Sequence, residues 1–122
     1  MAVTFNKRRL SGSTAGRGLT VTATASGNQV VHDPITTAIA TGDFDEVWLW
    51  ATNIHTTSVK LTIEFGATTA ANDHIVVTIP PDSGLVQVLP GLLISGNNDI
   101  QAFAGVASKI NLFGFVNLIT ES

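Results

Sequence analysis

The sequence predicts a nearly all-β protein, an antiparallel β-sandwich of jelly-roll or related topology with an extended N-terminal arm. Three observations support this prediction. Thr, Val and Ile, which favour strands, are abundant. The apolar residues mostly recur with a period of two, which is the pattern of half-buried strands. Short segments of this kind are separated by turn residues along most of the chain, as in sandwiches and barrels.

Residues 1–17 differ from the rest and are predicted to form a flexible arm outside the core. Glycines there are interleaved with Ser, Thr and Arg, and apolar periodicity is almost absent. The basic residues of this segment, which contains no acidic residue, are Lys7, Arg8, Arg9 and Arg17. The remaining residues carry two basic and nine acidic side chains, a net charge of −7. We therefore expect a basic arm that an acidic partner surface would attract, followed by one acidic domain, residues 18–122.

The first half of this domain is predicted to contain three strands. Residues 19–26 alternate Leu, Val and Ala with Thr and Ser, and Gly27-Asn28 ends this strand. Residues 46–54 and 59–65 form the next two strands, joined by a polar turn, and we expect this pair to form a hairpin. In the second of them, Lys60, Thr62 and Glu64 are predicted to lie on the face opposite the apolar one.

The second half is predicted to contain five short strands. Residues 74–79 form the first of them, and Pro80-Pro81 ends it because two successive residues lack an amide donor. The others are residues 85–89, 92–95, 100–103 and 110–119. A helix over residues 100–110 is the alternative for one of these segments, although Gly105, Val106 and Ser108 disfavour it.

Two predicted strands, one in the middle of the chain and one at its end, carry large apolar side chains on both faces. A strand in a two-layer sandwich has one inner and one outer face, so an apolar outer face must be covered by a loop, the arm or another chain. Large aromatic residues are also typical anchors of protein interfaces. The four residues that we expect to be either core residues or contacts between subunits are Trp48, Trp50, Phe113 and Phe115.

The sequence predicts no catalytic, metal-binding or cofactor-binding site, so we expect neither an enzyme nor a small-molecule substrate. The absence of cysteine excludes thiol catalysis and cysteine-liganded metals. The three histidines lack metal-ligand spacing, and the acidic cluster around Asp43 and Asp45 is expected to be a solvated turn. Residues 12–18 lack the lysine and the following helix of a phosphate-binding loop.

Neither a membrane nor a nucleic acid is an expected partner. The longest apolar run, residues 47–51, is far shorter than a membrane span. The basic arm could contact phosphates, but the acidic domain opposes such binding. The chain also lacks tyrosine and any strand in which basic and aromatic residues alternate, so a base-stacking surface is not predicted.

Several stretches of the chain together carry a family resemblance that extends from about residue 9 to residue 119. They are residues 9–14 (RLSGST), 45–51 (DEVWLWA), 60–66 (KLTIEFG), 79–85 (IPPDSGL) and 90–93 (PGLL), with the closing strand 110–119. These stretches resemble small structural proteins from the virions of tailed bacteriophages. Within that group the chain is most similar to capsid decoration proteins, also called cement proteins.

The resemblance implies a protein of the capsid exterior that is made in the host cytoplasm. It would bind the outer surface of the assembled shell and brace neighbouring subunits of the major capsid protein, often as a trimer. The anchors would be Lys7, Arg8, Arg9 and Arg17. A tail, fibre or baseplate component and a carbohydrate-binding module are the alternatives. A carbohydrate binder needs surface aromatic rings flanked by hydrogen-bonding groups, whereas Trp48 and Trp50 are expected to be buried.

Overall fold

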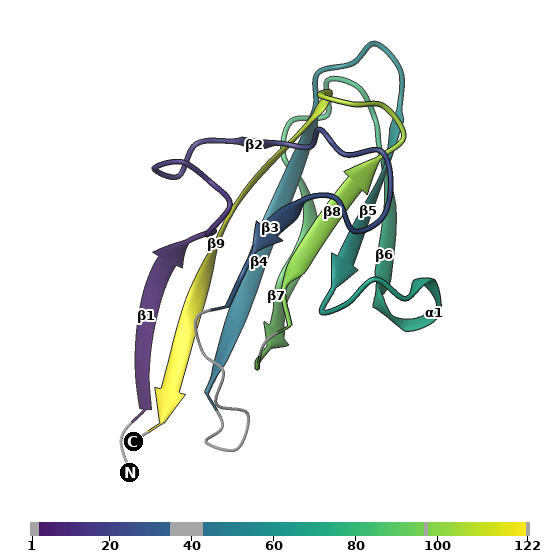
Figure 1. Ribbon diagram of the computed structural model, residues 1–122. Helices are drawn as coiled ribbons and strands as arrows, with labels where there is room; N and C mark the ends of the chain where they lie inside the picture. The colour runs from purple at the N-terminus through teal and green to yellow at the C-terminus, as the bar shows by residue number, and fades with distance from the viewer. Residues whose placement is uncertain (1–2, 35–42, 97, 122) are drawn as a thin grey trace.

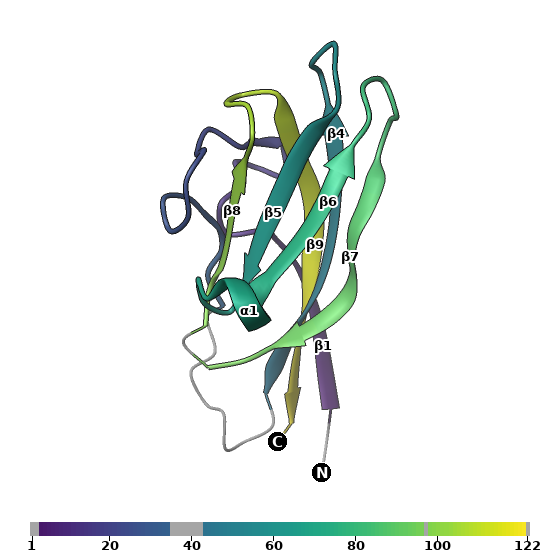
Figure 2. The same cartoon turned by 90° about the vertical axis from the view of Figure 1, so that its right-hand side faces the viewer.

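The computed structural model describes residues 3–34, 43–96 and 98–121, which form two antiparallel β-sheets packed face to face (Figure 1). The first sheet has the order β1 (Val3–Arg9), β9 (Ile110–Glu121), β4 (Phe44–Asn53), β7 (Val86–Ile94), and the short β2 (Leu19–Thr20) also pairs with β9. The second sheet has the order β3 (Val30–His32), β8 (Ile100–Ala104), β5 (Val59–Phe65), β6 (His74–Ile79). One helical turn, α1 (Ala70–Asp73), precedes β6. Figure 2 shows the two layers from the side.

The topology is that of a jelly roll. Between β2 and β9, the strands that the structure describes change sheet at every connection except the one from β5 to β6. With β1 set aside, the eight strands from β2 to β9 form two four-stranded antiparallel sheets, and strands connected in this way are the double Greek key of the jelly roll. The predicted all-β antiparallel sandwich is therefore confirmed. No helix among the described residues is long and apolar enough to cross a membrane.

The core lies between the two sheets and follows the alternation in the sequence. Val47, Leu49 and Ala51 of β4 are at most 1% exposed, and they face Leu61 and Ile63 of β5 across the core. The other apolar residues with at most 1% exposure that are larger than alanine are Leu10, Val21, Val31, Ile79, Leu89, Ile100, Ile110, Leu112 and Val116. Burial of each such side chain contributes about 1.5–3 kcal/mol to folding.

The expected hairpin between residues 46–54 and 59–65 is wrong, because these strands lie in different sheets. β4 pairs with β9 and β7, whereas β5 pairs with β6 and β8. Residues 54–58, polar except for the exposed Ile54, carry the chain from one sheet to the other. This crossing turns the Val47, Leu49 and Ala51 face of β4 and the Leu61 and Ile63 face of β5 toward the same core.

The prediction of a flexible arm is wrong for residues 3–9. These residues form β1, which pairs with β9 over seven positions, from Val3 opposite Glu121 to Arg9 opposite Phe115. Pairing at a sheet edge uses backbone groups, so it does not require an apolar period in the sequence. Leu10, directly after β1, is 1% exposed and belongs to the core.

Three further segments differ from their predicted form. The predicted strand 19–26 is only two residues long. The chain leaves β9 after Val21, whose N–H donates to the Ile110 carbonyl, and runs toward β8, where the Ala104 N–H donates to the Ala23 carbonyl. The segments 85–89 and 92–95 form one strand, β7, with an irregularity opposite β4 where Pro90 and Gly91 lie. Residues 70–73 form a helical turn within a predicted loop, and residues 100–104 form a strand, not a helix.

Candidate functional site

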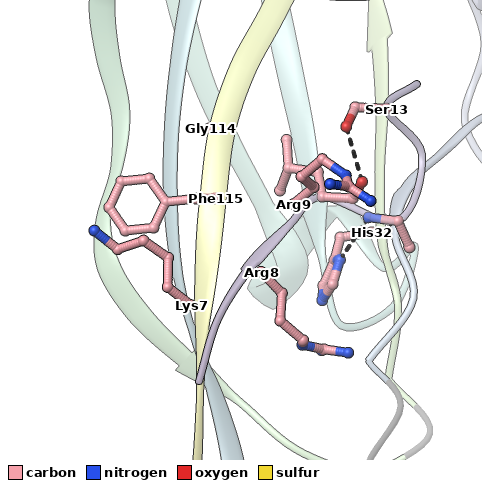
Figure 3. A pocket seen from close by; sticks show the side chains of 9 residues that line it. Lys7, Arg8, Arg9, Ser13, His32, Gly114 and Phe115 are labelled. Atoms are coloured by element: carbon pink, nitrogen blue, oxygen red, sulfur yellow. Dashed lines mark hydrogen bonds between the residues drawn. The ribbon is translucent and has the colours of Figure 1, made fainter. Parts of the chain in front are cut away.

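A basic pocket opens where β1 ends. β1 pairs with β9 as far as Arg9, and β2 resumes pairing at Leu19 opposite Leu112, so the intervening chain, residues 10–18, arches away from β9. The cavity has a volume of about 630 Å³. Its lining residues are Lys7, Arg8, Arg9, Leu10, Ser11, Ser13, His32, Gly114 and Phe115. Figure 3 shows Lys7 and Phe115 on one side of β9, with Arg8 and His32 on the other.

A buried polar network forms the inner wall of this pocket. His32 is 1% exposed and Asp45 is fully buried. The Ser11 backbone N–H donates to His32 Nδ1 (3.1 Å), so His32 Nε2 carries the proton and donates to Asp45 Oδ2 (2.7 Å). Arg8 Nη2 lies 3.4 Å from the same carboxylate oxygen. The network therefore joins β1 and the arching segment to β3 and β4.

The imidazole of His32 is engaged on both sides by this network. Its Nδ1 accepts from a backbone amide, and the nearby Ser11 hydroxyl instead accepts from the Asp33 N–H at 2.6 Å. A nucleophilic triad requires the hydroxyl on the imidazole nitrogen opposite the carboxylate. The His32–Asp45 pair is therefore not part of a nucleophilic triad, and it holds the chain in place at the pocket. Arg8 Nε and Asp45 Oδ1 are buried there without a hydrogen-bond partner among the described residues.

Three of the four predicted basic anchors meet at the pocket. Lys7 and Arg9 are exposed on the outer face of the first sheet, and Lys7 Nζ lies 4.6 Å from the centroid of the Phe115 ring. Arg8 points to the opposite side, toward Asp45. Arg9 has no ion pair or hydrogen bond from its side chain to any described residue, so its guanidinium can bind a ligand. Arg17 is exposed and lies outside the pocket, in a turn closed by its N–H bond to the Thr14 carbonyl.

The four aromatic residues singled out in the sequence lie on the outer face of the first sheet and not in the core. Trp48, Trp50, Phe113 and Phe115 are half-buried, while their neighbours on β4 and β9 fill the core. Trp48, Trp50 and Phe115 form a group with ring centroids 6.0–6.4 Å apart. The expectation that the tryptophans are buried is therefore wrong.

Glu46 lies beside this aromatic group. Its Oε1 accepts hydrogen bonds from Asn117 Nδ2 (3.0 Å) and from Trp48 Nε1 (2.7 Å). These two bonds, the first having the larger effect, lower the pKa of Glu46 against the opposing effect of burial. The carboxylate thus stays ionised at neutral pH and fixes the indole of Trp48.

A second buried acid, Glu64, was not identified from the sequence. It is fully buried on the outer face of the second sheet, beneath the chain between β2 and β3, and Thr62 beside it is 4% exposed. Its partners are Ser26 Oγ, the Gly27 N–H (2.9 Å) and His74 Nε2 (3.0 Å). Burial acts to raise the pKa of Glu64, but these bonds outweigh it and lower the pKa. Glu64 does lie on the face opposite the apolar one, as predicted, but the chain at Ser26 and Gly27 covers it there.

The part of the chain that the structure describes contains no group of three or more His, Cys, Asp or Glu side chains that could hold a metal ion. No family model, curated protein or solved structure matches the chain. Function must therefore be inferred from the residues and their geometry.

Proposed function

We propose that this protein is a capsid decoration protein of a tailed bacteriophage, which binds the outer surface of the assembled shell and braces neighbouring major capsid subunits. The observation that carries the proposal is the gathering of Lys7, Arg8 and Arg9 around one pocket, at the edge of a domain that is otherwise strongly acidic. The sequence resemblance points to the same role. The jelly roll is compatible with it, since this fold recurs in viral structural proteins, although a fold alone does not define a function.

Attachment would be electrostatic in this account. Residues 18–122 carry a net charge of −7, so an acidic shell surface repels most of the domain and attracts the edge that carries β1. The unpaired guanidinium of Arg9 can form two parallel hydrogen bonds to a carboxylate, and the Lys7 ammonium provides a second positive charge. Each contact is weak. If several protomers are joined, their contacts act together and the complex with the shell is much tighter.

We further propose that the protein acts as a homo-oligomer, most simply the trimer found in the group that it resembles. Surfaces suited to contact between copies lie where β1 begins and where β7 ends (Figure 1). There Val3, Phe5 and Leu93 are 54%, 65% and 55% exposed, respectively. Phe5 and Leu93 lie on opposite edges of the first sheet, with β9 and β4 between them, so they would take part in two separate contacts. Exposed apolar groups of this size are typical of association sites.

Co-sedimentation with capsids that lack the protein tests this function. We expect saturable binding that weakens as salt is raised, because screening shortens the range of the attraction to about 8 Å at 0.15 M salt. Arg9→Glu should reduce binding far more than Arg17→Glu, which changes the net charge equally but lies outside the pocket. Light scattering of the free protein counts the protomers.

Two outcomes would contradict the proposal. Absence of binding to both mature and expanded shells would exclude the decoration role. Equal loss of binding in the two charge-reversal variants would show that the attraction is diffuse and that the pocket is not the attachment site.

A further inference from the structure

The outer face of the first sheet carries a second feature, an aromatic group that adjoins the basic pocket at Phe115 and extends away from it over β4. The rings of Trp48, Trp50 and Phe115 have centroids 6.4, 6.2 and 6.0 Å apart, and their planes are within 17°, 16° and 28° of parallel. At these distances, nearly parallel rings either overlap partly or lie side by side on one surface. The contact between Trp48 and β7 shows which of these two arrangements is present.

Trp48 lies flat on the sheet. A Cβ placed at Gly91 of β7 would be 2.7, 2.9 and 3.2 Å from Cζ2, Cε2 and Cη2 of the Trp48 ring. Cζ2 is bonded to both Cε2 and Cη2. If Gly91 faced the edge of the ring, its Cβ would be much farther from Cε2 and Cη2 than from Cζ2. Gly91 therefore lies under the face of the indole, and the lack of a side chain at Gly91 lets the ring rest on β7.

Because the other two rings are nearly parallel to Trp48, they also lie flat on the sheet. The three rings thus form a flat aromatic platform, defined here as Trp48, Trp50 and Phe115, with one face toward the sheet and the other toward solvent. The half-buried state of all three residues agrees with this geometry. The platform differs from a typical protein contact site, in which aromatic side chains fill pockets of the partner.

Polar side chains surround the platform. Glu46 and Asn117 lie at one end, joined by a hydrogen bond, and the exposed Gln87 lies directly opposite Trp50 on β7. Lys7 Nζ is held over Phe115 by a flexible stem, and the exposed Arg9 lies directly opposite Phe115 on β1. The rim therefore offers hydrogen-bond donors and acceptors, with two cations at the Phe115 end and the Glu46 carboxylate beside Trp48.

We infer that this platform binds a neutral glycan chain, with consecutive pyranose rings stacked on the aromatic rings and their hydroxyls bonded to the polar rim. A pyranose with equatorial hydroxyls presents a flat face of C–H groups and a polar edge, which matches a flat apolar surface bordered by amide and carboxylate groups. The Glu46 carboxylate beside Trp48 disfavours an acidic chain over the two tryptophans, so a neutral chain of the glucose or N-acetylglucosamine type is favoured there. This inference does not rest on capsid attachment.

Tryptophan fluorescence reports this site selectively, because Trp48 and Trp50 are the two tryptophans of the chain, which has no tyrosine. Titration of the full-length protein with cellohexaose and with the hexamer of N-acetylglucosamine should give a saturable change in emission. The bound sugar should also protect the indoles from quenching by acrylamide. The affinity should hardly depend on salt, in contrast to capsid binding.

Variants separate the platform from general effects on folding. Trp50→Ala retains Trp48 as the reporter and should weaken binding at least about tenfold, whereas Trp50→Phe should keep most of it. Phe103→Ala is the matched control, since Phe103 is a half-buried ring on the opposite sheet, next to His74. It should leave the titration unchanged. Thermal melting confirms that each variant is folded.

Two results would overturn the inference. The first is unchanged emission with both hexasaccharides up to about 10 mM, a concentration that saturates even millimolar sites. The second is emission that changes with protein concentration in the absence of sugar, together with a loss of oligomer in Trp50→Ala, which would show that a second copy covers the platform. Capsid co-sedimentation by Trp50→Ala should match the wild type, so the glycan inference and the decoration role fail independently.

Discussion

Replacement of Leu10 by alanine should destabilise the whole domain, although Leu10 lies within the segment that the sequence predicts to be a flexible arm. Its side chain is 1% exposed and packs in the core. The chain on its C-terminal side is held by the bonds from the Ser11 N–H to His32 and from the Gly12 N–H to the Val31 carbonyl. The segment therefore cannot shift readily to fill the space that the shorter side chain leaves.

The size of the effect follows from the cost of a cavity. A fully buried Leu→Ala change costs about 2–5 kcal/mol, out of a total stability of about 5–15 kcal/mol for a domain of this kind. For a chain of 122 residues this corresponds to a fall in Tm of about 8–20 °C. Leu85→Ala is the matched control, because it is the same substitution at a side chain that is 60% exposed. It should change the stability by no more than about 0.5 kcal/mol.

Urea denaturation of the two variants, followed by far-UV circular dichroism, measures both effects. We expect a clear drop in the midpoint for Leu10→Ala and a nearly unchanged midpoint for Leu85→Ala. A wild-type midpoint for Leu10→Ala would refute the reasoning, because the core would then begin after residue 17. The same reasoning predicts that deletion of residues 2–17 destabilises the domain as well as weakening capsid attachment.

Three further predictions concern single side chains. The pKa of Glu64 in the folded protein lies below its ordinary value of 4.5. The ionised carboxylate therefore stabilises the fold above pH 4.5, and this contribution to stability is lost as the pH falls. Glu64→Gln should lower the urea midpoint at pH 7, and the midpoint of the variant should fall less than that of the wild type between about pH 5 and pH 3. An equal fall in both proteins would contradict this. Gly114→Ala drives a Cβ into the Trp48 carbonyl oxygen and should cost about 3 kcal/mol or more in urea denaturation, whereas Gly105→Ala, whose nearest atom is 3.9 Å away, should be tolerated. Gly91→Ala should lift the Trp48 ring and expose it to acrylamide, with a loss of about 1–3 kcal/mol from the strained φ of 78°; wild-type quenching would disprove the flat packing of the indole.

The alternation of apolar residues predicts which side chains share a face, but not which face is the inner one or which strands pair. In β4 it places Val47, Leu49 and Ala51 on one face and the two tryptophans on the other, and the structure shows that the first face is the inner one. The inner face has the same pattern whether the next strand lies beside β4 or across the core. The hairpin between β4 and β5 was wrong for this reason, since the polar turn after β4 is compatible with both arrangements.

The alternation of apolar and polar residues does not indicate features that depend on backbone pairing or on the path of a loop. β1 is held by its backbone pairing to β9, so its exposed and largely polar side chains suggested an arm. Glu64 occupies a position that alternation assigns to solvent, and the loop that buries it comes from a distant part of the sequence. The basic pocket combines both cases. Its cations were visible as a cluster in the sequence, but His32 and Asp45 join them only because the jelly roll brings β3 and β4 to the end of β1.

The central claim is that the edge carrying β1 and the basic pocket attaches the protein to a phage capsid. Electron cryomicroscopy of capsids saturated with the protein tests this claim most directly. The account predicts density for the jelly roll on the outer surface of the shell, with Lys7 and Arg9 directed toward acidic residues of the major capsid protein. A particle that carries the protein at the tail, or on the shell with β1 directed toward solvent, would contradict it.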